Sequence, residues 1–386
     1  MKNITSFLFI LWVVLFFLFF SACKNSSSSR SVDVAMYLDS LQSITLHLDS
    51  SAFFSSAYLE YDLSENKLYF LNEQSNLIRV YNVSTGKQIE TIQYAFTGPD
   101  GVGEVWGFHY HSQDSIFVFG KFKFTIYLTD SRGKVLNKYV LTGEDTPGYF
   151  PTPVVHGLQQ LFFIDNKLYF TGNYARQRKE GKYILPLFQY DISSKKLSHI
   201  GIAPQKVHEG FWESIDKVFL DRMGANKLII SNYISDSIFV YDIHSGKTDK
   251  HLAKSKYFSE QDIKPFSSSA ENRAKDYLER AKYHLGTPKY HAVLYDPVNK
   301  LIYRYVLYQH DYKKFLSGEP VKAGIMVFDE AFNKLGEFFL PSGYDFTMSF
   351  VGPKGLYMAN KKAYQANDNY LRFDLFTFKP QENALH

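Results

Sequence analysis

The side chains best suited to chemistry are four histidines and two glutamates, which lie in or beside the segments that link one β-rich unit to the next. They are His109, His156, His208 and His291, with Glu104 and Glu209 in comparable positions. Imidazole rings from neighbouring units could converge on Zn²⁺ or another divalent metal. The alternative is that each ring bonds a loop carbonyl, because the four histidines share no aligned position. No nucleophile motif, Cys–His pair or paired-carboxylate motif stands out, so the sequence predicts no catalytic residue and no cofactor.

A second group of residues combines positive charge with aromatic rings in three long loops, at 173–186, 308–324 and 360–370. The basic members are Arg176, Arg178, Lys179, Lys182, Lys313, Lys314, Lys361 and Lys362. The aromatic members are Tyr174, Tyr183, Tyr308, Tyr312 and Tyr364, which Trp106 and Trp212 of the linking segments could join. Aromatic faces stack on sugar rings or peptide, and basic groups bind carboxylate or phosphate. The alternative is that long loops are polar because they are solvated.

The elements that must position these residues recur along the chain. Residues 66–88 and 226–248 align without a gap, and ten of the 23 positions are identical. Strands of the type NKLYF occur in six units, each preceded by an apolar strand and followed by two more. The last unit lacks an outer strand, which residues 43–48 could supply. Six units of four short strands predict an all-β fold, a six-bladed β-propeller over residues 43–380 that is closed by the N-terminal strand.

In such a ring, the blade-linking loops and the loops between second and third strands open on one face. A helix near residues 267–285 is predicted as an insertion, with an apolar face that includes Tyr277 and Leu278, although a degenerate seventh blade could hide in residues 251–290. The asparagines that end the second strands, Asn72, Asn173, Asn232 and Asn360, are interpreted as Asx-turn residues. The same interpretation applies, on the opposite face, to Asn82, Asp130, Asp191, Asp242, Asp329 and Asp374.

The N-terminus has the form of a secretory signal. An apolar run from Ile4 to Phe20 precedes small residues and Cys23, the single cysteine of the 386-residue chain. We predict a signal peptide over residues 1–22, lipidation of Cys23, and a flexible tether over residues 23–42. The alternative is an uncleaved membrane anchor. The net charge of +4 is small, and no basic stripe or nucleic-acid-binding motif is present, so no nucleic-acid partner is expected.

The signal with its cysteine, the six strand units and the link GPDGVGE at residues 98–104 resemble the six-bladed TolB-like propeller lipoproteins of Gram-negative bacteria. The resemblance implies a fold and an envelope location, with the outer membrane favoured because Lys24 replaces the Asp associated with inner-membrane retention. It implies no reaction, because many of these families have no known function.

Three functions remain open, and the last of them is a purely structural scaffold in an envelope complex. The first is a lipid-anchored module that binds an envelope glycan, a peptide or a partner protein through the mouth of the ring. The second is a propeller enzyme, such as a hydrolase, lyase or lactonase, that uses histidines and carboxylates of the channel and, in one version, a metal.

Overall fold

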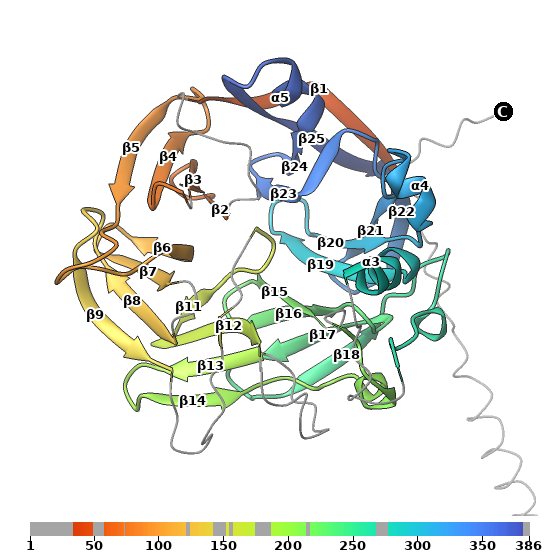
Figure 1. Cartoon of the computed structure of the whole chain (residues 1–386), viewed down its shortest axis with the longest axis horizontal. Helices are drawn as coiled ribbons and strands as arrows, with labels where there is room; N and C mark the ends of the chain where they lie inside the picture. The colour runs from red at the N-terminus through yellow and green to blue at the C-terminus, as the bar shows by residue number, and fades with distance from the viewer. Residues whose placement is uncertain are drawn as a thin grey trace, which may run out of the picture. The chain divides into compact units, whose positions relative to one another are not determined.

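The six predicted blades are present as six antiparallel sheets. The computed structural model describes residues 34–48, 58–72, 74–120, 124–141, 152–153, 157–173, 187–213, 217–267 and 277–380. Asp33–His386 form one compact unit, and Figure 1 shows its sheets arranged around a common axis. The predicted six-bladed β-propeller is therefore confirmed.

Each blade runs from an inner strand near the axis to an outer strand at the rim. In that order, blade 1 consists of β2 (Leu59–Asp62), β3 (Lys67–Asn72), β4 (Leu77–Asn82) and β5 (Gln88–Gln93). Blade 2 consists of β6 (Val105–Ser112), β7 (Ser115–Gly120), β8 (Thr125–Thr129) and β9 (Val135–Val140). Blade 3 consists of β10 (Thr152–Pro153) and β11 (Phe162–Ile164), then β12 (Lys167–Asn173), β13 (Leu187–Asp191) and β14 (Lys196–His199).

The second half of the ring repeats this order. Blade 4 consists of β15 (Val218–Met223), β16 (Lys227–Asn232), β17 (Ser237–Asp242) and β18 (Thr248–Leu252). Blade 5 consists of β19 (Lys289–Asp296), β20 (Leu301–Leu307), β21 (Ala323–Asp329) and β22 (Lys334–Phe339). Blade 6 consists of β23 (Tyr344–Gly352), β24 (Gly355–Asn360), β25 (Tyr370–Pro380) and β1 (Val34–His47).

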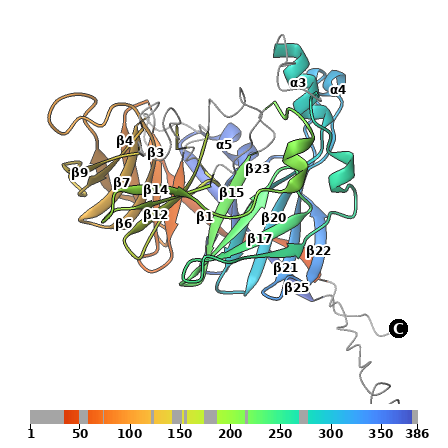
Figure 2. The same ribbon diagram turned by 90° about the horizontal axis from the view of Figure 1, so that it is seen from below.

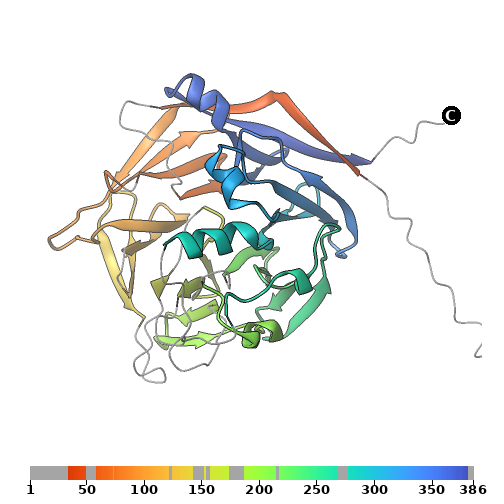
Figure 3. The same ribbon diagram turned by 45° about the vertical axis from the view of Figure 1, so that its right-hand side comes forward.

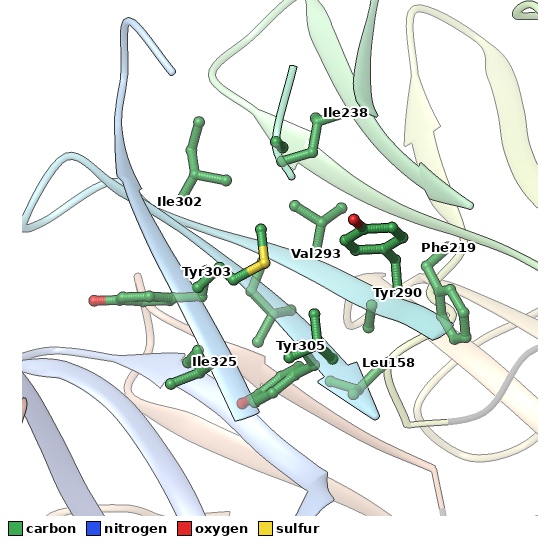
Figure 4. Close-up of a cluster of buried hydrophobic side chains, with 14 of the residues drawn as sticks. Leu158, Phe219, Ile238, Tyr290, Val293, Ile302, Tyr303, Tyr305 and Ile325 are labelled. Atoms are coloured by element: carbon green, nitrogen blue, oxygen red, sulfur yellow. The ribbon is translucent and has the colours of Figure 1, made fainter. Parts of the chain in front are cut away.

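Packing between neighbouring blades explains why the second strands are apolar on both faces. In β3 and β16 every residue after the first is buried, whereas the outer strands β5 and β9 are mostly exposed. Figure 4 shows one cluster of buried side chains, in which Tyr290, Tyr303 and Tyr305 of blade 5 take part. The Tyr303 hydroxyl donates to Asp296 Oδ2 at 2.7 Å, so the polar atom of this buried side chain has a hydrogen-bond partner.

The N-terminal strand closes the ring, as predicted, but it is longer than the sequence indicated. β1 pairs with β25 from Val34 opposite Pro380 to His47 opposite Tyr370, with an irregularity between Asp39 and Ile44. Figure 3 shows the two strands side by side at the rim. Residues 34–42, which we had assigned to the tether, belong to this strand, because β25 continues to Pro380 and offers backbone partners along that length.

Blade 3 departs from the four-strand pattern. Its inner position is shared by β10, which pairs with the Asn173 end of β12, and β11, which pairs with the Lys167 end. The predicted single inner strand over residues 158–164 is therefore reduced to Phe162–Ile164.

The insertions lie on one face of the ring. They are η1 (Gln205–Glu209), η2 (Glu260–Asp262), α3 (Tyr277–Gly286), α4 (Tyr312–Leu316) and α5 (Lys361–Ala366). Because the strands of a blade alternate in direction, the loops that carry these helices all leave the sheets on the same side. Figure 2 shows α3, α4 and α5 on that side. We call it the insertion face, and we call the opposite side the turn face.

The predicted helical insertion is present, but its predicted apolar face is wrong in part. α3 ends at Gly286 as expected, whereas Tyr277 and Leu278 are 81% and 41% exposed. The helix is held through its C-terminal half instead. The Tyr283 hydroxyl donates to Lys264 O, and the Leu285 carbonyl accepts the N–H of His310, just before α4. The segment in which the helix was expected to begin lies outside the described residues.

Asx turns close the hairpins on both faces. On the turn face, the side chains of Asn82, Asp130, Asp191, Asp242 and Asp329 each accept a backbone N–H two to four residues later. On the insertion face, Asn72, Asn232 and Asn360 do the same, whereas the side chain of Asn173 is outside the described set.

Asp374 is the exception among the predicted turn residues. It lies within β25, and its carboxylate accepts from Tyr344, Asn360 and Arg372. The strand does not end at this residue, so Asp374 ties together the strands of blade 6 rather than a turn.

Candidate functional site

The structure disperses the predicted site residues over several places on the insertion face and the inner strands. Cys23, His156, Arg176 and Arg178 lie outside the described residues, as do Lys179, Lys182, Tyr174 and Tyr183 of the same loop. The remaining residues fall into four groups, and each group has its own surroundings.

The first group follows the Gly-rich link between blades 1 and 2. Glu104 is exposed, and Trp106 is half-buried at an irregularity of β6, between Val105 and Gly107. A bulge at such a place turns a side chain away from the regular pleat. Trp106 therefore stands at the start of an inner strand on the insertion face, where an aromatic platform for a ligand was expected.

Asn76 holds this link in place. Its amide Nδ2 donates to Tyr94 O at 3.2 Å and to Gly103 O at 2.8 Å, and its Oδ1 accepts the N–H of Val105 at 2.6 Å. The side chain is fully buried. One amide thus satisfies two carbonyls and one N–H of a loop that would otherwise bury them without partners.

The second group is centred on His109, which contacts Glu60, a residue that no sequence motif singled out. Its Nδ1 lies 2.8 Å from Glu60 Oε1, and Glu60 Oε2 accepts the backbone N–H of Tyr110 at 3.0 Å. The side chains of Glu60 and His109 are only 12% and 13% exposed. Because an ionised carboxylate can only accept, Nδ1 is the donor in this contact. Glu60 therefore orients the ring and joins the inner strands of blades 1 and 2.

An equivalent carboxylate joins blades 4 and 5. Asp221 Oδ2 accepts the backbone N–H of Tyr295 at 2.7 Å, and Oδ1 accepts that of Arg222. Burial of the carboxyl group raises the pKa of Asp221 to about 7, against the opposing effect of these two N–H donors. Glu60 pairs across its sheet with Tyr69, and Asp221 pairs with Ile229, so the two acids occupy matching register positions.

The third group lies before β15. His208 and Glu209 are exposed on η1, and Glu209 contacts the buried Lys206 at 3.2 Å. Trp212, predicted to contact a ligand, is buried at 3% exposure and donates its indole N–H to Val207 O. We therefore interpret Trp212 as a packing residue, because it presents no face to solvent.

The fourth group surrounds His291 at the start of blade 5. The ring is 8% exposed and lies among Phe219, Tyr233 and Phe346, with ring centroids 4.4, 5.1 and 5.1 Å away. These neighbours come from blades 4 and 6 and from the loop after β16. His291 is therefore a part of the aromatic packing between blades.

The histidines within the described ranges do not converge on one point. Among the described residues, no group of three or more His, Cys, Asp or Glu side chains is placed to hold a metal ion. His109 and His111 come nearest to one another, with ring centroids 6.5 Å apart, and His109 already bonds Glu60.

The described part of the predicted basic rim is exposed. Lys313 and Lys314 lie on α4, and Lys361 and Lys362 lie on α5. The aromatic residues of the same loops are less exposed to solvent. Tyr308 is buried and donates to Glu337 at 3.2 Å, while Tyr312 and Tyr364 are half-buried. The rim is thus more basic than aromatic.

The fold and these sites define a β-propeller with one elaborated face. The family model described as a domain of unknown function, DUF4221, matches residues 36–338. The chain belongs to the DUF4221 family. Among curated proteins, none matches this chain, and no helix in the described ranges is both long and apolar enough to span a membrane.

Two solved structures share the architecture. A DUF4221 family member from Bacteroides vulgatus has a TM-score of 0.73 at 18% identity, over 91% of this chain and 100% of that chain. A protein of Bacteroides fragilis that is named as exported has a TM-score of 0.53 at 10% identity, over 92% of this chain and 98% of that chain. At these identities the likeness shows the fold alone.

Proposed function

We propose that this protein is a lipid-anchored binding module of the bacterial envelope, which takes a glycan, a peptide or a partner protein on its insertion face. The observation that carries the proposal is the contrast between the two faces. In the described chain, all five helical insertions lie on one face, and the other face carries hairpin turns. Loops elaborated on a rigid scaffold are where binding residues are usually found.

The course of β1 supports the orientation that such a module needs. β1 begins at Val34 opposite Pro380, at the turn face, and runs toward the insertion face. Residues 24–33 separate it from Cys23, and ten residues span at most about 35 Å. In this proposal, the chain that follows a lipidated Cys23 enters the ring at the turn face, the side opposite the proposed binding face.

The charges of the described insertion face fit a ligand from the aqueous side. Lys313, Lys314, Lys361 and Lys362 are exposed there, and Trp106 is half-buried close to the axis. An outer-membrane position follows the resemblance described above, and the exported Bacteroides fragilis protein with the same fold is consistent with an envelope location.

Binding of the full-length chain, held in detergent micelles, to glycan and peptide arrays tests the proposal. We expect a variant with Lys313, Lys314, Lys361 and Lys362 changed to Glu to bind its ligand at least tenfold more weakly, with a weaker salt dependence. The matched control changes four lysines that are exposed on the turn face to Glu and should bind within twofold of the parent; they are Lys87, Lys134, Lys195 and Lys247. Equal losses in both variants, or a loss confined to the control, would overturn the proposal.

A further inference from the structure

The outer edge of blade 6 carries an apolar patch close to the start of β1. Tyr37, Leu38 and Leu41 are 48%, 44% and 95% exposed, and they follow Val34, the first residue of the strand. Figure 3 shows β1 at the rim of the ring, as the outermost strand of its sheet. We call these three side chains the β1 patch.

A polar network holds Leu41 away from the ring. The register of β1 against β25 breaks after Asp39, where residues 40–43 bulge out. Asp39 Oδ1 accepts the N–H of Leu41 at 3.1 Å, and Asp39 Oδ2 accepts from Gln42 Nε2 at 2.7 Å. Lys354, in the turn between β23 and β24, donates to Gln42 Oε1 at 2.7 Å. The carboxylate of Asp39 is thus bonded within the bulge, and the bulge presents its leucine to solvent.

The sequences that flank the described ends of the blade are too polar to cover the β1 patch. Residues 24–33 read KNSSSSRSVD, in which Val32 is the single aliphatic residue. Residues 381–386 read QENALH, in which Leu385 is the single large apolar residue. Removing the patch from water therefore requires a partner outside these flanks.

The bulge argues against a second copy of the chain as that partner. β1 ends the strand order of its sheet, and edge strands of this kind can pair with strands of other molecules. A bulge interrupts the row of backbone groups and is one of the means by which proteins prevent such pairing. Contact through the exposed side chains, rather than addition of a strand, therefore suits this edge.

The lipid predicted on Cys23 brings a bilayer within reach of the β1 patch. Residues 24–33 lie between Cys23 and β1 and span at most about 35 Å. Tyrosine is enriched at membrane interfaces, and leucine enters the boundary between headgroups and acyl chains. Lys354 and Lys379 are exposed, and Lys379 pairs across the sheet with Ala35, so positive charge is available for anionic headgroups.

We infer that the β1 patch docks on the surface of the bilayer that carries the Cys23 lipid. Tyr37, Leu38 and Leu41 enter the interfacial region, and Lys354 and Lys379 meet lipid phosphates. The tether makes this contact intramolecular, so three apolar side chains suffice where a free domain would need more. The inference rests on the proposed lipid anchor and adds a second contact, which orients the ring on its membrane.

A fluorescent label tests the inference, because Cys23 is the single cysteine and a lipidated chain has no other thiol. The full-length chain with Leu41→Cys carries the label in vesicles of phosphatidylethanolamine and phosphatidylglycerol. We expect nitroxide-bearing lipids to quench this label at least threefold more than a label at Leu316→Cys. Leu316 is the matched control, because it is 66% exposed on α4 of the insertion face.

Substitutions in the β1 patch separate membrane docking from proximity enforced by the tether. Tyr37→Ser with Leu38→Ser should reduce quenching of the Leu41 label at least twofold. Leu136→Ser with Leu252→Ser, at exposed positions of β9 and β18, should leave it unchanged. Both pairs should keep the urea midpoint of the parent, because all four side chains are exposed.

Three results would overturn the inference. Equal quenching at Leu41 and Leu316 in a lipidated chain would remove the membrane contact and leave the proposed binding module intact. A label that is shielded in proportion to protein density, and is not quenched by the lipids, would identify a second copy as the partner. Labelling of Cys23 in the parent would show a free thiol there, and would remove the lipid anchor from the proposed function as well.

Discussion

Blades 1 and 4 share nearly the same middle strands, yet they fasten their insertion-face loops with different side chains. In blade 1, Asn76 donates to Tyr94 O, and Gln93 Nε2 donates to Ser75 O. The repeat places Asp236 where blade 1 has Asn76. Leu252 occupies the place of Gln93. Neither a carboxylate nor a leucine side chain can donate, so these two bonds need another source in blade 4.

Arg304 of blade 5 supplies those donors. Its guanidinium donates to Ala253 O and Ser235 O, which occupy the places of Tyr94 O and Ser75 O, and also to Ser231 Oγ. The side chain is fully buried and stacks 4.0 Å from the Tyr290 ring. Burial lowers the pKa of Arg304 to about 10, so it remains charged at neutral pH.

The two blades differ in the source of these donors. In blade 1 they come from the same blade, whereas in blade 4 they come from Arg304 of blade 5. The carboxylate of Asp236 accepts from the Ser237 hydroxyl, and the backbone N–H of Asp236 donates to the Glu260 carboxylate of η2. The long insertion that contains α3 starts from this second kind of junction. The repeat is therefore conserved in its strands and different at its loops.

The largest effect is expected from Arg304→Met. It removes the donors from three buried carbonyls and one hydroxyl, each of which costs about 1–3 kcal/mol when left without a partner. We expect the free energy of unfolding to fall by about 3–5 kcal/mol, measured by urea denaturation. Arg132→Met is the control, because the Arg132 side chain is 83% exposed, and it should change the midpoint little. A loss equal to that of the control would show that blade 4 does not depend on blade 5.

A smaller loss is expected from Asn76→Asp, which gives blade 1 the residue of blade 4 without the arginine. The new carboxylate would face Tyr94 O and Gly103 O, so we expect a loss of about 2–3 kcal/mol. Hydrogen exchange of residues 94–105 should accelerate more than that of β7 and β8. If exchange were unchanged, the loop would be held by something other than this amide.

The inner-strand carboxylate of Asp221 should make the stability of the fold depend on pH. The folded-state pKa of Asp221 is about 7, above its value in the unfolded chain, so the folded state binds more protons between about pH 4 and 7. The stabilising contribution of the protonated carboxyl group is therefore lost as pH rises through this window, and unfolding should become easier. Asp221→Asn should flatten this slope between pH 5 and 8, whereas Asp242→Asn in a turn should not. An unchanged slope in Asp221→Asn would contradict the assignment.

The smallest effect is expected where the two blades agree. Asn82 and Asp242 both accept a backbone N–H three residues later, from Thr85 and Ser245. Exchanging them as Asn82→Asp and Asp242→Asn should leave the urea midpoint of each variant unchanged, because either oxygen can close the turn. A marked fall in the urea midpoint of one variant would show that blades 1 and 4 also differ on the turn face.

Much of the fold follows from the sequence because its signals are local. Strand alternation, the glycine turns and the Asp or Asn residues before them each act within a few residues, and they predicted six blades and the closing strand. The start of β1 at Val34 did not follow, because the strand is extended by pairing with β25, more than 330 residues away. Tyr277 and Leu278 gave a helical pattern, but a pattern does not say what covers the helix.

The candidate site was predictable only in part for the same reason. Glu104 and Trp106 are correctly on the insertion face, because strand order decides the face. Glu60 and Asp221 carry no motif, and their inter-blade partners come from the blade that follows. The 160-residue repeat does contain one usable signal, the change from Asn76 to Asp236, which implies that a donor must come from elsewhere.

The sequence alone determined the number of blades and the face on which the insertions gather, since both depend on short-range pairing and on alternation of strand direction. The tertiary structure decided which charges meet. Glu60 and His109 are brought together by the stacking of one blade on the next, and Arg304 reaches the carbonyls of blade 4 in the same way. Contacts between blades depend on the closed ring, which no short stretch of residues encodes.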